Sequence, residues 1–162
     1  MENKRMKNTC CFFGHRTIDE TDALQKNVAT VVERLIAQEG VDTFLFGSKS
    51  RFDELCLAIV TKLKEKYPHI KRVYVRAEFP VIDEAYFIYL QNFYEETYYP
   101  AQLVGAGRAV YVKRNREMID QSAFCVVYHD AHHAPTGRKS GTAVALEYAV
   151  KRGKCVFHVL PR

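Results

Sequence analysis

Three short segments of this chain place glycine beside hydroxyl and basic side chains, which are groups that bind phosphate. These segments are Gly14-His15-Arg16, Gly47-Ser48-Lys49-Ser50 and Lys139-Ser140-Gly141-Thr142. Arg16 keeps its positive charge, and its fork of donors fits a phosphate or a carboxylate. A Ser-Gly-Thr sequence that opens a helix would add unpaired backbone N–H groups and the positive end of the helix dipole. The alternative is that Ser140 or Thr142 only caps that helix.

The elements that must position these segments follow an alternating pattern. Short apolar runs at residues 9–13, 43–46, 73–75, 109–112, 123–129 and 155–160 predict strands. Helical periodicity lies between most of these runs, for example after Asp19 or Thr21 and again from about Gly141 to Arg152. This alternation predicts an α/β fold with a mostly parallel sheet and crossover helices. The three segments follow predicted strands or open a helix after one, which is where open sheets bind ligands.

Several residues near these segments have two possible roles. The ring of His15 could order its loop through a hydrogen bond, or it could contact a ligand directly. Asp53 could bind a ribose hydroxyl, or it could cap a helix, as Ser50 could. Gly14 lacks the two following glycines of a GxGxxG turn, which argues against an ordinary dinucleotide-dependent dehydrogenase.

Residues 79–99 interrupt the alternation with eight aromatic side chains: Phe79, Tyr86, Phe87, Tyr89, Phe93, Tyr94, Tyr98 and Tyr99. Helical spacing in this segment predicts an amphipathic helix whose stripe is Tyr86, Tyr89, Leu90 and Phe93. The stripe would cover the sheet or a subunit interface, or it would offer a ring for stacking on a nucleobase. Assembly into a homo-oligomer therefore stays open.

The composition limits the class of protein. A length of 162 residues fits a single domain, expected to span residues 1–162. The net charge of +5 is compatible with phosphate-bearing ligands, whether small nucleotides or nucleic acid. No apolar stretch approaches the length of a membrane span and no signal peptide is recognisable, so we expect a cytoplasmic protein with no membrane partner. The five cysteines lie in apolar segments, as core residues in a reducing compartment do.

We do not expect a metal site or a cofactor. His129, His132 and His133 lie close together in a polar loop. They have no cysteine beside them and no firm ligand spacing, so an ordinary solvated loop is predicted there.

Four ordered segments resemble one protein family. They are TCCFFGHR, FLFGSKSRFDELC, YVKRNREMIDQSAFCVVYHD and KSGTAVALEYAVKRGK. Together they are similar to the YpsA-like branch of the SLOG superfamily, which also includes the DprA DNA-processing proteins and the LOG-type phosphoribohydrolases. The resemblance runs from about Thr9 to the C-terminus. It implies a Rossmann-like fold with a nucleotide-sized pocket at the strand ends, and for YpsA-like members it implies no settled reaction.

The resemblance also implies roles for particular residues. Gly141 and Thr142 look like the Gly-Thr of the LOG phosphate loop, and Arg16 gains a role in ligand binding. Arg114 precedes Met118 by four residues, which is the spacing of the LOG arginine. Arg114 would therefore be the phosphate-binding or catalytic arginine.

Other positions depart from the LOG pattern. The LOG loop carries PGG where this chain has Arg-Lys-Ser, and it carries its catalytic glutamate at the position of Ala145. The nearest carboxylate here is Glu147, and two positions rotate a side chain by roughly 200° around a helix. Glu147 is either a pocket-facing acid or an ion-pair partner of Lys151. These departures count against a simple transfer of the hydrolase mechanism.

The second segment departs from the family as well. Related proteins commonly carry paired glycines there, whereas Gly47 of this chain is followed by Ser48 and Lys49. A second glycine would let a ligand approach the backbone more closely. Lys49 could supply a positive charge in compensation.

The sequence favours a protein that binds a nucleotide or nucleotide derivative, in a sensor or ligand-binding role. One alternative is an N-glycosidic hydrolase of nucleoside monophosphates, with Arg114 and Glu147 as the catalytic candidates. A second alternative is DprA-like binding of single-stranded nucleic acid through Lys113, Arg114, Arg116 and the tyrosines. The expected ligand contacts are Gly14, His15, Arg16, Gly47, Ser48, Arg114, Ser140, Gly141 and Thr142.

Overall fold

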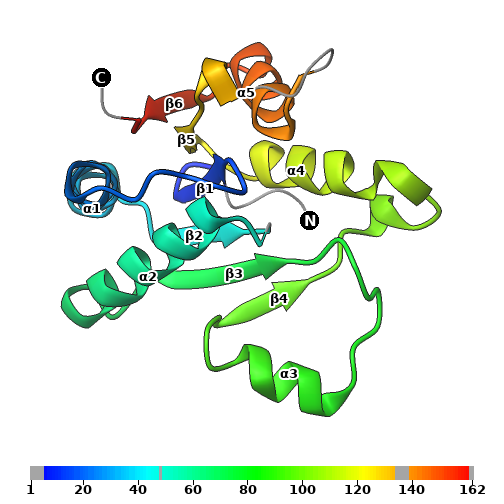
Figure 1. Ribbon diagram of the computed structural model, residues 1–162. Coiled ribbons are helices and arrows are strands. Elements are labelled where there is room, and N and C mark those ends of the chain that lie inside the picture. The colour runs from blue at the N-terminus through cyan, green and yellow to red at the C-terminus, as the bar shows by residue number, and fades with distance from the viewer. Residues whose placement is uncertain (1–5, 48, 134–138, 161–162) are drawn as a thin grey trace.

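The computed structural model describes residues 6–47, 49–133 and 139–160, and a β-sheet forms its centre (Figure 1). Its strands are β1 (Thr9–Gly14), β2 (Thr43–Phe46), β3 (Lys71–Val75), β4 (Glu96–Tyr98), β5 (Phe124–Tyr128) and β6 (Cys155–His158). Within the described residues the strand order is β4-β3-β2-β1-β5-β6, and every neighbouring pair is parallel. The carboxyl ends of these strands therefore lie along the same edge of the sheet.

Helices cover both faces of this sheet (Figure 1). The α-helices are α1 (Asp22–Glu39), α2 (Arg51–Lys66), α3 (Glu84–Leu90), α4 (Val110–Asp120) and α5 (Gly141–Lys151), and short 3-10 turns are η1 (Ala101–Leu103), η2 (Gly107–Ala109) and η3 (Ala131–His133). Helices α1 and α2 pack on one face, α4 and α5 pack on the other, and α3 lies beyond β4. This arrangement confirms the predicted Rossmann-like α/β fold. None of the described helices is both long enough and apolar enough to span a membrane.

Strand β1 shows why both faces need a cover. Cys10 and Phe12 pack with α1 and α2, whereas Cys11 and Phe13 pack with α4 and α5. Successive strand residues point to opposite faces, so a strand that is apolar throughout belongs in the middle of a parallel sheet. Burial raises the pKa of the Cys10 and Cys11 thiols, which keeps them protonated. The expectation that all five cysteines are core residues is wrong for Cys155, which is exposed.

Helices α1 and α2 begin at side-chain caps. Thr21, and not Asp19, caps α1, because its Oγ1 accepts a hydrogen bond from the backbone N–H of Leu24 at 3.0 Å. Gly40 ends α1 with a φ of 73°, in the left-handed region that glycine adopts readily. Ser50 caps α2, where its Oγ accepts from the N–H of Asp53 at 3.1 Å.

The strand expected at residues 109–112 is not formed. Gly107–Ala109 make the 3-10 turn η2, and α4 follows directly. Tyr111 and Val112 have strand-prone side chains, yet they stay exposed on the first turn of α4. The buried residues of this helix recur at helical spacing and are Arg114, Met118 and Ile119. Packing of that buried face overrides the local strand preference. The fourth strand along the chain is instead β4, which pairs with β3 at the edge of the sheet.

The aromatic segment at residues 79–99 contains both α3 and β4. Leu90 is the buried residue of α3, whereas Tyr89 and Phe93 are 55% and 39% exposed. Helix α3 lies beyond the edge strand β4 (Figure 1), and of the predicted stripe only Leu90 is buried. Tyr94 makes the inward contact instead, and its ring stacks on that of Tyr74 at 5.2 Å.

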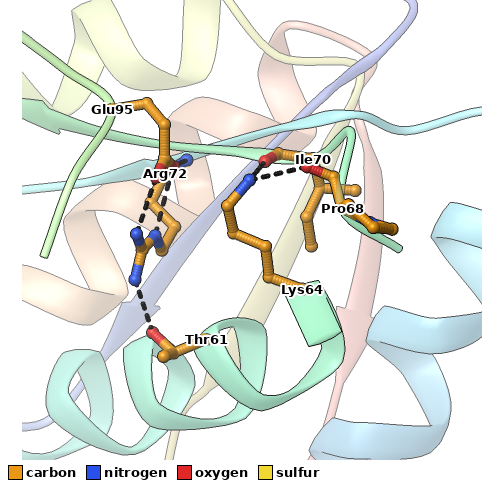
Figure 2. A network of polar contacts seen from close by, with 6 residues as sticks. All are labelled: Thr61, Lys64, Pro68, Ile70, Arg72 and Glu95. Atoms are coloured by element: carbon orange, nitrogen blue, oxygen red, sulfur yellow. Dashed lines mark hydrogen bonds and ion pairs between the residues drawn. The ribbon is translucent and has the colours of Figure 1, made fainter. Parts of the chain in front are cut away.

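Polar contacts fasten the amino end of β3 to its surroundings (Figure 2). Arg72 donates from Nε and Nη2 to the two carboxylate oxygens of Glu95, at 3.1 and 2.6 Å, and from Nη1 to Thr61 on α2 at 3.1 Å. Lys64 donates to two backbone carbonyls of the turn before β3. Burial alone would raise the pKa of Glu95, but the hydrogen bonds and charge of Arg72 outweigh it and lower that pKa. This network joins α2, β3 and the chain that enters β4.

Candidate functional site

The strand order creates a crevice at the carboxyl edge of the sheet, beside β1. The neighbours of β1 are β2 and β5, and the helices that follow β1 and β5 pack on opposite faces. Ligands of open α/β sheets bind at such a switch point. A cavity of about 570 Å³, here called the first pocket, opens at this place. Its lining is Phe12, Phe13, Gly14, His15, Arg16, Thr17, Lys49, Ser50, Asn115, Ser140, Gly141 and Thr142.

A second cavity of about 430 Å³, here called the second pocket, adjoins the first. Its lining is Arg16, Gly47, Lys49, Tyr74, Ala77, Glu78, Tyr111 and Arg114. Arg16 and Lys49 line both cavities, so the boundary between the two pockets carries two positive charges. Eight of the nine expected ligand contacts line one pocket or the other. The ninth, Ser48, lies outside the described residues.

The loop that leaves β1 is held from two sides. His15 is buried, and its Nε2 accepts a hydrogen bond from the backbone N–H of Asp130 at 2.9 Å. The carbonyl of Arg16 accepts from the N–H of Arg51, at the first residue of α2, at 3.0 Å. Of the two roles open to His15, ordering of the loop is therefore present, and it requires an unprotonated Nε2. The ring also lines the first pocket, so contact with a ligand stays a prediction.

Arg16 and Lys49, which line both pockets, have side chains without a polar partner among the described residues. Both side chains are exposed. Within the described residues, the guanidinium of Arg16 and the ammonium of Lys49 make no hydrogen bond or ion pair. Both residues line the two pockets, and neither forms an ion pair with a carboxylate of the described residues.

The start of α5 supplies the opposite wall of the first pocket. Ser140 caps the helix, because its Oγ accepts from the N–H of Ala143 at 3.0 Å. Gly141 and Thr142 are the first two helical residues, and N–H groups at such positions have no acceptor within a helix. The capping role is therefore compatible with the predicted anion site, because the cap uses the side chain of Ser140 and not the amides of Gly141 and Thr142.

The three glycines of the site differ in the space that surrounds them. A Cβ on Gly14 would lie 2.3 Å from the Phe52 ring, and a Cβ on Gly47 would lie 2.6 Å from Sδ of Met118. Both positions therefore need glycine to make room for the protein's own side chains. A Cβ on Gly141, which lines the first pocket, would meet nothing within 4 Å, so packing does not require glycine there.

Arg114 is buried and lines the second pocket. Its Nη1 donates to the carbonyls of Gly47 at 2.6 Å and Val75 at 3.4 Å, and its Nε donates to Asn115. Nη2 makes no hydrogen bond with any described residue. Burial lowers the pKa of Arg114, because the charged form is less stable away from water. The side chain thus joins the ends of β2 and β3 through the Gly47 and Val75 carbonyls.

Two carboxylates considered from the sequence lie outside both pockets. Asp53 is buried, and its Oδ2 accepts from the N–H of Gly47 at 3.2 Å, so it holds the turn between β2 and α2. Glu147 is exposed on α5 and pairs with Lys139 at 2.8 Å, rather than with Lys151 as expected. The carboxylate that does line a pocket is Glu78, which accepts a hydrogen bond from the Tyr111 hydroxyl.

Several lining residues were not predicted as ligand contacts. They are Phe12, Phe13, Thr17, Lys49, Ser50, Tyr74, Ala77, Glu78, Tyr111 and Asn115. The rule that strand ends carry ligand sites would have drawn attention to residues 76–78, directly after β3. None of the aromatic residues within 79–99 lines either pocket. Among the described residues, no group of histidine, cysteine and acidic side chains is arranged to hold a metal ion.

Comparisons with known proteins give a similarity to solved structures. No protein-family model matches the chain, and no curated protein matches it. Among solved structures, the chain is similar to S. aureus TarJ, whose crystal structure contains NADPH. The match has a TM-score of 0.43 with 11% sequence identity, and it covers 88% of this chain and 46% of TarJ. This chain therefore corresponds to less than half of TarJ.

Proposed function

We propose that this chain binds a nucleotide or nucleotide derivative through its phosphate at the carboxyl edge of the sheet. The observation that carries the proposal is the first pocket, which Arg16 and the start of α5 line together. The amides of Gly141 and Thr142 and the positive end of the α5 dipole favour an anion, and Arg16 adds a full charge. A cavity of about 570 Å³ falls in the range of about 300–1,000 Å³ that is usual for small-molecule sites.

This function agrees with the sequence resemblance to the YpsA-like branch of the SLOG superfamily, and we include that membership in the proposal. A sensor or ligand-binding role is favoured over the hydrolase alternative, because Glu147 lies outside both pockets and pairs with Lys139. The nucleic-acid alternative loses support at the basic cluster. Arg114 is buried there, which leaves Lys113 and Arg116 as the exposed cations of the cluster.

Thermal unfolding with AMP and ADP tests this proposal. A ligand at 100 times its dissociation constant adds about 2.7 kcal/mol to the free energy of unfolding. For a chain of this length, that corresponds to a rise of roughly 5–10 °C in Tm. The absence of any shift across a set of nucleoside phosphates would contradict the proposal.

The Arg16→Ala variant identifies the site. Loss of a charge-assisted hydrogen bond should weaken ADP binding about ten- to hundredfold, as measured by calorimetry. Arg34→Ala is the matched control, because Arg34 is an exposed arginine on α1 outside both pockets and its loss changes the net charge equally. Equal weakening in both variants would mean that net charge, and not this site, governs binding.

A further inference from the structure

The boundary between the two pockets has the properties of a site for a multiply charged linker. Arg16 and Lys49 line both cavities, and their charged groups have no partner among the described residues. A single phosphate on the amides of α5 would use the first pocket alone. A second anionic group joined to it would lie between the two cations, where it is held by both charges.

The second pocket differs from the first in its aromatic lining. Tyr74 is half-buried, and the ring of Tyr94 stacks on it at 5.2 Å with an angle of 19° between the planes. This contact fixes Tyr74 as a rigid platform at the end of β3. Tyr111, on the first turn of α4, adds a second ring. Aromatic side chains of this kind stack on the faces of nucleobases.

The polar groups of the second pocket also suit a nucleoside better than a phosphate. Glu78 carries a negative charge there, which repels phosphate and accepts hydrogen bonds from ribose hydroxyls or base N–H groups. The hydroxyl of Tyr111 donates to this carboxylate and holds it in place. Arg114 lines the same cavity, and its Nη2, which makes no hydrogen bond within the described residues, could donate to a base acceptor.

From these two unlike cavities and the cations between them, we infer that the ligand is a dinucleoside diphosphate, with two nucleosides joined by a diphosphate. One nucleoside lies in the first pocket with its phosphate on the start of α5. The diphosphate passes Arg16 and Lys49, and the second base stacks against Tyr74 in the second pocket. This inference rests on the proposed function and adds the class of ligand to it.

Calorimetry on the full chain with AMP, ADP and diadenosine diphosphate tests the inference. ADP serves as the reference because it has the same two phosphates and lacks the second nucleoside. Stacking and hydrogen bonding of that nucleoside should make diadenosine diphosphate bind about five- to hundredfold more tightly than ADP. Gly141→Ala adds a methyl group at a residue that lines the first pocket, where a Cβ would meet nothing within 4 Å, and it should weaken both ligands by a similar factor.

Tyr111→Ala tests the second pocket. Tyr111 is 49% exposed, so its removal should leave the fold intact, and the ratio of the two affinities should fall to within about twofold. Tyr89→Ala is the matched control, because Tyr89 is 55% exposed and lies outside both pockets; it should keep the wild-type ratio. If ADP and diadenosine diphosphate bind wild type equally, the inference is overturned while the proposed function stands. If neither compound nor AMP binds, the proposed function itself fails.

Discussion

Two buried arginines lie near opposite ends of strand β3, and they differ in what neutralises their charge. Arg72, at the amino end, makes a two-point ion pair with Glu95 and a further hydrogen bond to Thr61 (Figure 2). Arg114, at the carboxyl end, donates to backbone carbonyls and to Asn115. Within the described residues, no carboxylate forms an ion pair with Arg114.

This difference separates a stabilising site from the proposed binding site. At the amino end the positive charge is balanced inside the protein, so nothing further is needed there. At the carboxyl end the charges of Arg16, Lys49 and Arg114 converge on two cavities without an ion pair among described residues. Burial lowers the pKa of Arg114, and the nearby Asp53 carboxylate acts in the opposite direction.

The largest effect on stability is expected from Arg72→Met. The variant leaves Glu95 without its partner, and it should lower the free energy of unfolding by about 2–3 kcal/mol in urea at pH 7. That estimate lies below the roughly 3–5 kcal/mol of fully buried pairs, because solvent reaches Glu95. ADP affinity should not change. The control is Lys62→Met, which breaks the exposed pair with Glu65 and should cost less than about 1 kcal/mol.

The pH dependence of stability gives this prediction a second readout. The pKa of Glu95 is lowered in the folded state, so its contribution is complete above its ordinary value of about 4.5 and is lost as the pH falls through the folded value. The stability difference between wild type and Arg72→Met should therefore shrink as the pH falls below about 4.5. A difference that stays constant down to pH 3 would contradict the assigned role of this pair.

Arg114→Met should affect both stability and binding. Loss of the donors to the Gly47 and Val75 carbonyls should lower the free energy of unfolding by about 1–2 kcal/mol. If Nη2 contacts the ligand, the affinity for diadenosine diphosphate should fall about tenfold, which is equivalent to about 1.4 kcal/mol. Arg72→Met removes the same charge from the other end of β3 and serves as the control. Equal losses of affinity in the two variants would remove the contrast between the two ends.

The central strands could be predicted because local and tertiary preferences agree there. Residues 9–13 are apolar throughout, as a strand covered on both faces must be, and they fall within β1. Residues 109–112 could not be assigned correctly, because Tyr111 and Val112 favour a strand locally while Arg114 and Met118 must be buried at helical spacing. Only the packing of that helix on the sheet decides between these preferences.

The first pocket was easier to predict than the second. Its glycine and hydroxyl residues lie in short segments that directly follow a strand or open a helix. The second pocket combines Tyr74, Glu78 and Tyr111 from separate elements, and Tyr111 reaches it only because α4 replaces the expected strand. The sequence also could not show that Gly14 makes room for Phe52, because that contact joins β1 to α2.

The smallest effect on stability and binding is expected from Glu147→Gln. This variant extends the comparison of paired and unpaired charges from arginines to carboxylates. Glu147 is exposed and pairs with exposed Lys139, so its neutralisation should change the free energy of unfolding by less than about 0.5 kcal/mol. ADP affinity should stay within about twofold of wild type, because Glu147 lines neither pocket. Glu78→Gln is the matched substitution inside the second pocket, and it should weaken diadenosine diphosphate binding while Glu147→Gln does not. Release of adenine from AMP by wild type, abolished in Glu147→Gln, would instead restore the hydrolase alternative and place a working acid where the structure shows a surface ion pair.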